Sequence, residues 1–102
     1  MACASSAYSI LEAFHSLQRG DCEVALAGGS EGCIGRMSYQ GFGAMHALST
    51  HYNETPAEGS RPFDKNRCGF VMGEGGAILV LERLQSALAR GAPIIISLTP
   101  SN

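Results

Sequence analysis

The strongest constraint on the fold is a stripe of apolar residues near the N-terminus that repeats with the period of an α-helix. The stripe consists of Ala7, Ile10, Leu11, Phe14 and Leu17, at positions i, i+3, i+4, i+7 and i+10. Arg19 followed by Gly20 predicts the end of this helix, because glycine readily adopts the left-handed conformation that closes one. An amphipathic helix buries one face only, and we expect this face to pack against a sheet.

Apolar segments further along the chain predict the strands of that sheet. Residues 24–27 form a short apolar run that is typical of a fully buried strand, and residues 77–81 predict a second buried strand. A helix is expected over about residues 82–90, and residues 94–98 have the composition of a third strand. The order helix, strand, loop, strand, helix, strand indicates a layered α/β fold.

Six glycines crowd the stretch that follows the first predicted strand. They are Gly28, Gly29, Gly32, Gly35, Gly41 and Gly43. So many glycines favour irregular backbone, so we expect loops with at most a short helix over about residues 39–47. The polar residues 51–61, which include a proline and a glycine, predict an exposed loop.

Composition excludes several classes of function. The formal net charge is −2, so no basic surplus would attract nucleic acid. No apolar run approaches the roughly 20 residues that span a bilayer, and the first residues do not have the pattern of a signal peptide. The four cysteines, at positions 3, 22, 33 and 68, form no CxxC pair and no zinc-ligand spacing. We therefore expect reduced thiols in an intracellular compartment, with no metal, nucleic-acid or membrane partner.

Cys3 lies at the start of the predicted helix, where a thiol is most easily activated. The partial positive charge and free N–H groups of a helix N-terminus stabilise a thiolate and could hold an oxyanion on an acyl group that it attacks. A small buried apolar residue is the alternative reading of a free cysteine.

Four separated sequence blocks, spanning about residues 2–93, resemble the β-ketoacyl-acyl carrier protein synthases. The blocks are Ala-Cys-Ala-Ser-Ser-Ala at 2–7, Arg-Gly-Asp-Cys-Glu-Val-Ala-Leu-Ala-Gly-Gly-Ser-Glu at 19–31, Gly-Phe-Gly-Ala-Met at 41–45 with Ala-Leu-Ser-Thr at 47–50, and Arg-Pro-Phe-Asp-Lys-Asn-Arg at 61–67 with Gly-Phe-Val-Met-Gly-Glu-Gly at 69–75 and Leu-Val-Leu-Glu at 79–82. The pattern looks most like the elongating, decarboxylating condensing enzymes of fatty-acid biosynthesis. It looks less like the ketosynthase segment of a polyketide synthase.

The resemblance implies a partial thiolase-like layered α/β fold, from the N-terminal half of a duplicated unit. A chain of 102 residues is much shorter than that fold, so we expect a fragment of it. Residues 1–93 are expected to be a partial β-ketoacyl synthase N-terminal domain, and residues 94–102 a divergent C-terminal tail. Met1 stands where the family usually has threonine, at the end of a strand that we expect to be missing here.

The resemblance also implies a reaction in which Cys3 is the nucleophile. An acyl group passes from a thioester to the sulfur, and a decarboxylated malonyl thioester then attacks the acyl-enzyme to give a 3-oxoacyl thioester. The Cys3 main-chain N–H looks like one oxyanion-hole donor. The second donor and two catalytic histidines are expected outside this chain. Acyl carrier protein is the implied partner and delivers both substrates on its phosphopantetheine arm; no metal or organic cofactor is implied, and family members are usually homodimers.

Further site residues follow from matching positions. Phe42 resembles the aromatic residue that lines the acyl-chain pocket, although it would also be a good core residue, and Ser38 is expected to line the same pocket. A polar loop that supports the site is expected from Asp64, Lys65, Asn66 and Arg67. The family commonly has aspartate where this chain has Cys68, which puts the geometry of that loop in doubt.

Other assignments compete with this one. His15 would lie about 18 Å from Cys3 along one helix, too far to act as its base, and His46 and His51 match no family histidine. Gly-Gly-Ser-Glu-Gly around Ser30 fits a serine-hydrolase elbow, but no histidine follows His51 to complete a triad. A non-catalytic truncated fragment and a cysteine hydrolase with a distant histidine stay open as alternatives.

Overall fold

The N-terminal helix begins and ends close to where the sequence predicts. In the computed structural model, which describes residues 1–99, a short 3-10 turn, η1 (Ala2–Ala4), leads into helix α1 (Ser5–Arg19). Gly20 closes α1 with a φ of 81°, and the N–H of Asp21 bonds to the carbonyl of Ser16 at 2.9 Å. Glycine adopts this left-handed conformation without a steric penalty, which explains why the helix stops here.

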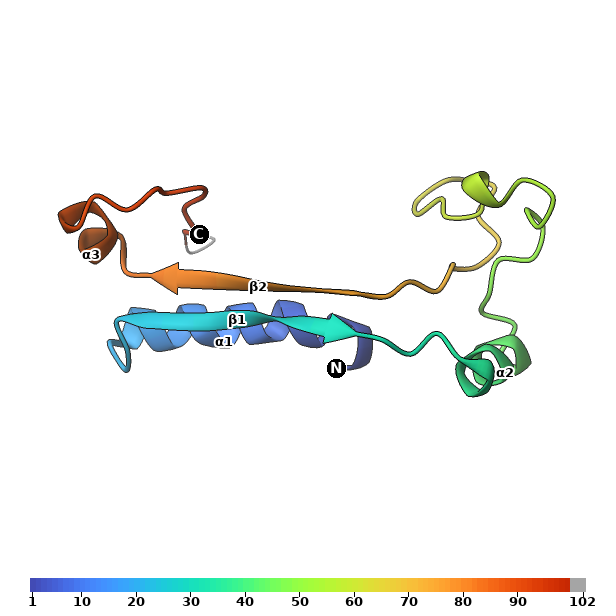
Figure 1. Cartoon of the computed structure of the whole chain (residues 1–102), viewed down its shortest axis with the longest axis horizontal. Coiled ribbons are helices and arrows are strands. Elements are labelled where there is room, and N and C mark those ends of the chain that lie inside the picture. The colour runs from blue at the N-terminus through green and yellow to red at the C-terminus, as the bar shows by residue number, and fades with distance from the viewer. Residues whose placement is uncertain (100–102) are drawn as a thin grey trace. The chain divides into compact units, whose positions relative to one another are not determined.

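Two strands form one antiparallel pair, β1 (Val24–Glu31) and β2 (Gly75–Glu82), as Figure 1 shows. At one end of the pair the N–H of Arg83 bonds to the carbonyl of Glu23 at 3.4 Å, and at the other Gly76 faces Ser30. The two strands are thus paired in the sheet although residues 32–74 separate them along the chain. Both strands are longer than expected, because glycines at their ends continue the pairing.

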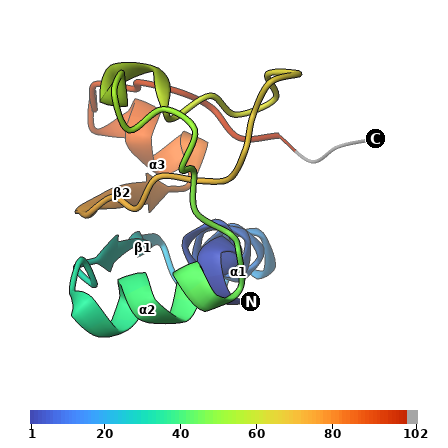
Figure 2. The ribbon, with the colours of Figure 1, turned by 90° about the vertical axis from the view of Figure 1, so that its right-hand side faces the viewer.

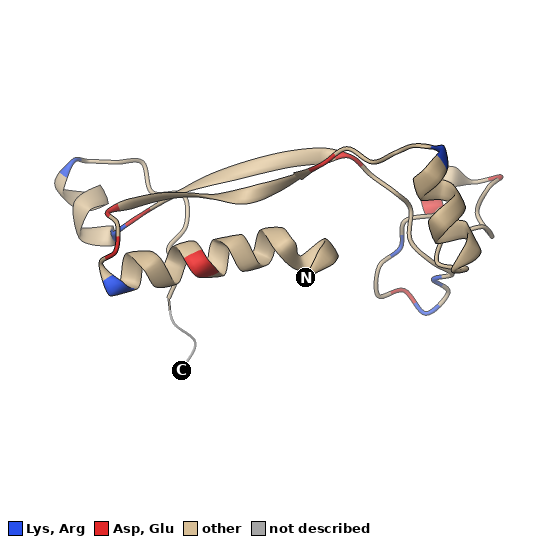
Figure 3. Cartoon of the chain, turned by 90° about the horizontal axis from the view of Figure 1, so that it is seen from below, with Lys and Arg blue, Asp and Glu red and all other residues tan. Residues whose placement is uncertain are grey.

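The chain divides into two units, of which the first holds the sheet. Within the described residues this unit comprises 1–30 and 76–99, and it contains α1, helix α3 (Leu84–Ala89) and both strands except for Glu31 and Gly75. In Figure 2, α1 lies beside β1, and α3 lies next to β2. Charged residues lie at or beyond the ends of the strands, whereas residues 24–30 and 75–81 include none (Figure 3).

The expectation that both strands are fully buried is wrong. Ala27 on β1 is buried, but Leu26 is 71% exposed and Val80 on β2 is 67% exposed. Strand residues alternate between two faces, and α1 packs against only one face of this sheet. A strand of continuous apolar residues is buried only when other elements pack on both faces of its sheet. Within residues 1–99 the face opposite α1 is left exposed.

The predicted third strand, residues 94–98, is also wrong. These residues are irregular in the structure. Leu98 and Thr99 instead line a groove of about 510 Å³ along α1, opposite Leu11 and Phe14. An apolar run becomes a strand only where a neighbouring strand offers its free N–H and C=O groups, and within residues 1–99 this segment pairs with no strand. The last three residues of the expected tail, 100–102, lie outside the described residues.

The second unit, residues 31–75, contains little regular structure, as the glycine content predicts. Helix α2 (Arg36–Ala44) begins three residues before the expected short helix, and a 3-10 turn, η2 (Pro56–Glu58), interrupts the otherwise irregular loop 51–61. A parallel bridge pairs Leu48 with Phe70. Across residues 1–99, no helix combines the length and the apolar character that crossing a bilayer requires.

Candidate functional site

Cys3 is an exposed residue in the η1 turn, one position before the Ala4 N-cap of α1. The turn is held by the N–H of Ala4, which bonds to the carbonyl of Met1 at 2.9 Å. The Ser5 hydroxyl also donates to the carbonyl of Ala2 at 2.7 Å. The thiol is therefore exposed to solvent in the turn that leads into a fifteen-residue helix. The position of Cys3 just before that helix is as the sequence predicts.

Small residues fix the N-terminal half of α1 on strand β1. The Ser9 hydroxyl accepts the N–H of Gly28 at 3.0 Å and lies 2.7 Å from the carbonyl of the same residue. A Cβ on Gly29 would come within 2.8 Å of the Ser6 Cβ, so the close approach requires glycine there. Sequence reasoning missed Ser9, since its partner is nineteen positions away and no local pattern marks the contact.

Ser38 and Phe42 lie four residues apart on α2 and therefore share one face of that helix. Both are half-buried. The Phe42 ring packs edge-to-face on Phe70, with ring centroids 5.1 Å apart and an interplanar angle of 82°. A nearby pocket of about 370 Å³ is lined by Phe70 but by neither Ser38 nor Phe42. Their role in an acyl-chain pocket stays a prediction.

The predicted polar loop is held together largely by its own main chain. Asp64 Oδ1 accepts the N–H of Asn66 at 2.7 Å, and the Asp64 carbonyl accepts the Arg67 guanidinium at 3.0 Å. Lys65 has no hydrogen-bond or ion-pair partner for its side chain within residues 1–99. Three of the four predicted residues thus share contacts, and their support of a catalytic site stays a prediction.

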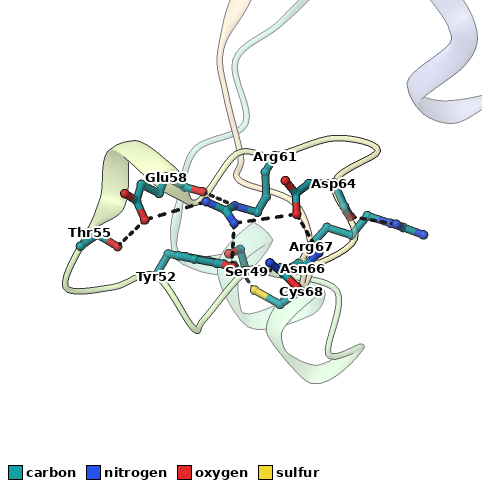
Figure 4. Close-up of polar contacts among 9 residues, drawn as sticks. All are labelled: Ser49, Tyr52, Thr55, Glu58, Arg61, Asp64, Asn66, Arg67 and Cys68. Carbon is teal, nitrogen blue, oxygen red and sulfur yellow. Dashed lines mark hydrogen bonds and ion pairs between the residues drawn. The ribbon is translucent and has the colours of Figure 1, made fainter.

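Arg61 organises this loop, and sequence reasoning did not single it out (Figure 4). Its guanidinium donates to the Glu58 carbonyl at 2.8 Å and to the Tyr52 hydroxyl at 2.9 Å, and it lies 4.1 Å from the centre of the Tyr52 ring. Asp64 is 3.9 Å away as an ion-pair partner, while the Tyr52 hydroxyl donates to the Asn66 carbonyl at 3.2 Å. One cation therefore joins segments on both sides of η2.

Cys68, which stands where the family commonly has aspartate, makes a contact of its own with the segment before the loop. Its sulfur lies 3.1 Å from the Ser49 hydroxyl oxygen (Figure 4). The Ser49 hydroxyl and the main-chain N–H groups of His51 and Thr50, together with the charge of Arg61, hold the pKa of the Cys68 thiol below its ordinary value, against the opposing effect of burial. The hydrogen bond between Cys68 and Ser49 thus links the loop to the segment before it.

The candidate residues fall into both units. Cys3 belongs to the first unit, and Ser38, Phe42 and the polar loop belong to the second. The ring centroids of His15 and Phe14 on α1 are 5.9 Å apart. His15 also lines the groove along α1. Within the described residues, no group of three or more His, Cys, Asp or Glu side chains is placed to hold a metal ion.

Comparisons with known proteins give one consistent result. The family model described as "Beta-ketoacyl synthase, N-terminal domain" matches residues 1–87. The 3-oxoacyl-[acyl-carrier-protein] synthase 2 of Rhizobium meliloti (strain 1021) is 50% identical over 93 residues, which make up 91% of this chain and 22% of that protein. The mitochondrial 3-oxoacyl-[acyl-carrier-protein] synthase of Arabidopsis thaliana is 48% identical over 97 residues, 95% of this chain and 21% of that protein.

Solved structures agree with the sequence relatives. A type II polyketide synthase acyl-carrier protein in complex with its ketosynthase contains a chain that matches with a TM-score of 0.84 at 35% identity, over 89% of this chain and 22% of that one. A β-ketoacyl synthase from Burkholderia phymatum STM815 matches with a TM-score of 0.80 at 41% identity, over the same shares of the two chains. The described elements thus have the arrangement found in a partial thiolase-like α/β fold, and the chain spans about a fifth of the length of these relatives.

Proposed function

Because this chain belongs to the β-ketoacyl synthase family, we propose that it provides the nucleophile-bearing part of a 3-oxoacyl-[acyl-carrier-protein] synthase of fatty-acid elongation. Cys3 is the acyl acceptor. The observation that carries the proposal is the exposed Cys3 thiol in the turn that opens α1, inside the region that matches the family.

The proposed chemistry at Cys3 is a thioester exchange. The Cys3 sulfur, as thiolate, attacks the carbonyl of an acyl thioester; the new C–S bond forms, the old one breaks, and the carrier leaves as a thiolate that takes up a proton. The Cys3 main-chain N–H stabilises the oxyanion of the tetrahedral intermediate. Ser9 has an indirect, positioning role, because its hydrogen bond to Gly28 fixes α1 and the turn before it on β1.

Condensation is proposed for the whole protein of which such a region forms part. A malonyl thioester loses carbon dioxide, and the resulting carbanion attacks the acyl group on Cys3 to release a 3-oxoacyl thioester two carbons longer. The reaction is driven by decarboxylation and needs no metal or organic cofactor. Acyl carrier protein is the proposed partner for both substrates, in line with the relative solved with its carrier protein, and a homodimer is the proposed assembly.

Two comparisons favour fatty-acid elongation over polyketide synthesis. The fatty-acid relatives are 48 to 52% identical to this chain, whereas the polyketide ketosynthase is 35% identical. Phe42 and Ser38 are proposed to line the acyl-chain pocket, and Asp64, Lys65, Asn66 and Arg67 to support the site.

Intact-mass spectrometry after mixing with a medium-chain acyl-acyl carrier protein tests the proposal. We expect one added acyl group, lost in Cys3→Ser and kept in Cys33→Ser, a matched control because Cys33 is the other exposed thiol in the chain. An adduct that survives in Cys3→Ser would contradict the assignment. No adduct on a chain shown to be folded by circular dichroism would favour a non-catalytic role instead.

A further inference from the structure

The aromatic side chain of Phe63, in the second unit, is almost completely exposed. Its exposed fraction is 98%, although phenylalanine is among the residues most often buried in a core. The φ of Phe63 is 64°, in the left-handed region, which a bulky residue rarely adopts. A side chain this exposed adds almost nothing to the packing of its own unit, so that packing does not offset the backbone strain. Strain of this kind is typical of functional positions.

A tight turn over residues 61–64 holds Phe63 in this position. The N–H of Asp64 bonds to the carbonyl of Arg61 at 3.3 Å, and Pro62 has its φ fixed near about −65° by its ring. Proline followed by a residue of positive φ is the pattern of a type II turn, in which glycine is the preferred residue at the second central position. An aromatic residue therefore occupies a position that glycine would fill without strain.

The two ends of this turn are fixed, so Phe63 is presented by an ordered segment. At one end the Arg61 guanidinium donates to the Tyr52 hydroxyl at 2.9 Å, and at the other Asp64 Oδ1 accepts the N–H of Asn66 at 2.7 Å (Figure 4). An ordered segment loses little conformational entropy when it binds. Aromatic side chains presented in this way are typical of the residues that carry most of the energy of a protein interface.

The charges beside this aromatic side chain favour an acidic partner. The two carboxylates nearest to it in sequence, Glu58 and Asp64, are both ion-pair partners of Arg61, at 3.8 and 3.9 Å. Lys65 and Arg67 are exposed, and in the described part of the chain neither of them forms an ion pair. Two cations without carboxylates of their own are complementary to an acidic surface.

We infer that Phe63, with Lys65 and Arg67 beside it, is a docking point for the carrier protein that delivers the acyl group. The choice of partner rests on the proposed function, whereas the docking itself requires no reaction at Cys3. The ring enters an apolar pocket on the carrier protein, and the two cations face acidic side chains around that pocket. The aromatic contact sets the affinity, and the cations make that affinity depend on salt.

Fluorescence anisotropy of a labelled holo acyl carrier protein, titrated with the whole chain, tests the docking point. We expect Phe63→Ala to raise the dissociation constant by about tenfold or more. Met37→Ala is the matched control, because Met37 is 84% exposed in the same unit, and it should leave the constant unchanged. Lys65→Glu should weaken binding, whereas Arg36→Glu, at another exposed cation of this unit, should not. Equal affinities of the wild type and Phe63→Ala, or no binding by the wild type, would overturn the inference.

A glycine variant separates the strain of the turn from its role in docking. Both Phe63→Gly and Phe63→Ala remove the ring, so both should lose carrier affinity to the same extent. Glycine adopts a positive φ without strain and alanine does not, so Phe63→Gly should have the higher melting temperature of the two. A lower melting temperature for Phe63→Gly would show that the strained turn is not held in solution, and would remove the basis of the inference.

Two further measurements distinguish this inference from others. Intact-mass spectrometry of the folded chain with a low-molecular-weight acyl thioester reports on Cys3 alone, so a missing adduct refutes the proposed function while carrier binding through Phe63 still supports the docking point. An adduct on Cys3 together with carrier affinity that Phe63→Ala does not change has the opposite meaning. Analytical ultracentrifugation of the chain by itself tests another occupant. Self-association that Phe63→Ala abolishes would assign the turn to a second copy of the chain and overturn the inference.

Discussion

Replacing Gly28 with alanine should weaken the pairing of β1 with β2. A Cβ at this position would lie 2.0 Å from the carbonyl oxygen of Ala77 and 3.0 Å from the Ile78 Cα, both main-chain atoms that no rotamer change can move. A carbon and an oxygen need about 3.3 Å, so the strands must separate by more than about 1 Å at this point. Hydrogen bonds stretched by that much pass the limit of about 3.2 Å for good geometry.

The magnitude follows from the bonds that would be lost. Two or three hydrogen bonds between the strands around Gly28 are each worth roughly 1 kcal/mol, for a cost of about 2–3 kcal/mol. Alanine restricts the unfolded chain and returns roughly 0.4–1 kcal/mol. We therefore expect a net loss of about 2 kcal/mol in the free energy of unfolding.

Urea denaturation followed by circular dichroism measures this loss, with Gly32→Ala as the matched control. Nothing lies within 4 Å of a Cβ on Gly32, so that variant should be slightly stabilised by the same effect on the unfolded chain. If the two variants unfold within about 0.5 kcal/mol of each other, the close packing of β2 over Gly28 is not a feature of the molecule in solution.

Two further predictions concern the first unit. Leu17 is one of three buried apolar residues there, with Ala27 and Ala87. Its replacement by alanine should lower the free energy of unfolding by about 2–3 kcal/mol in the same urea assay. A loss below about 1 kcal/mol would mean that the Leu17 side chain is not packed. The hydrogen bonds from Arg90 hold the pKa of Glu82 below its ordinary value, so their contribution is present at neutral pH and is lost as pH falls through that lowered pKa. Between pH 5 and 3 the wild type should therefore lose more stability than Arg90→Gln, and parallel curves for the two proteins would refute this.

Local patterns in the sequence predict the elements whose causes are local. The stripe from Ala7 to Leu17 and the Gly20 stop predict α1 almost to the residue, and the runs around Leu26 and Leu79 place both strands. Residues 94–98 were expected to form a strand and do not, because composition does not show whether an unpaired strand edge is within reach.

The candidate site divides in the same way. Cys3 could be singled out because its position at a helix start is itself a local signal. Ser9, Ser49 and Arg61 could not, since their partners lie between three and nineteen positions away and are chosen by the folded backbone. The match of residues 1–87 to the family confirms the kind of fold, and it tests none of these contacts individually.

The insertion of a whole unit between paired strands has a consequence for the order of assembly. A hairpin usually closes over two residues, but β1 and β2 close over residues 32–74, which costs roughly 3 kcal/mol more in chain entropy. Inside the second unit, the N–H of Ile34 bonds to the carboxylate of Glu74 at 2.8 Å and draws the two ends of that segment together. During synthesis β1 can pair with β2 only after about forty further residues have been made. If the inserted segment folds before the strands pair, it shortens the loop that they have to close.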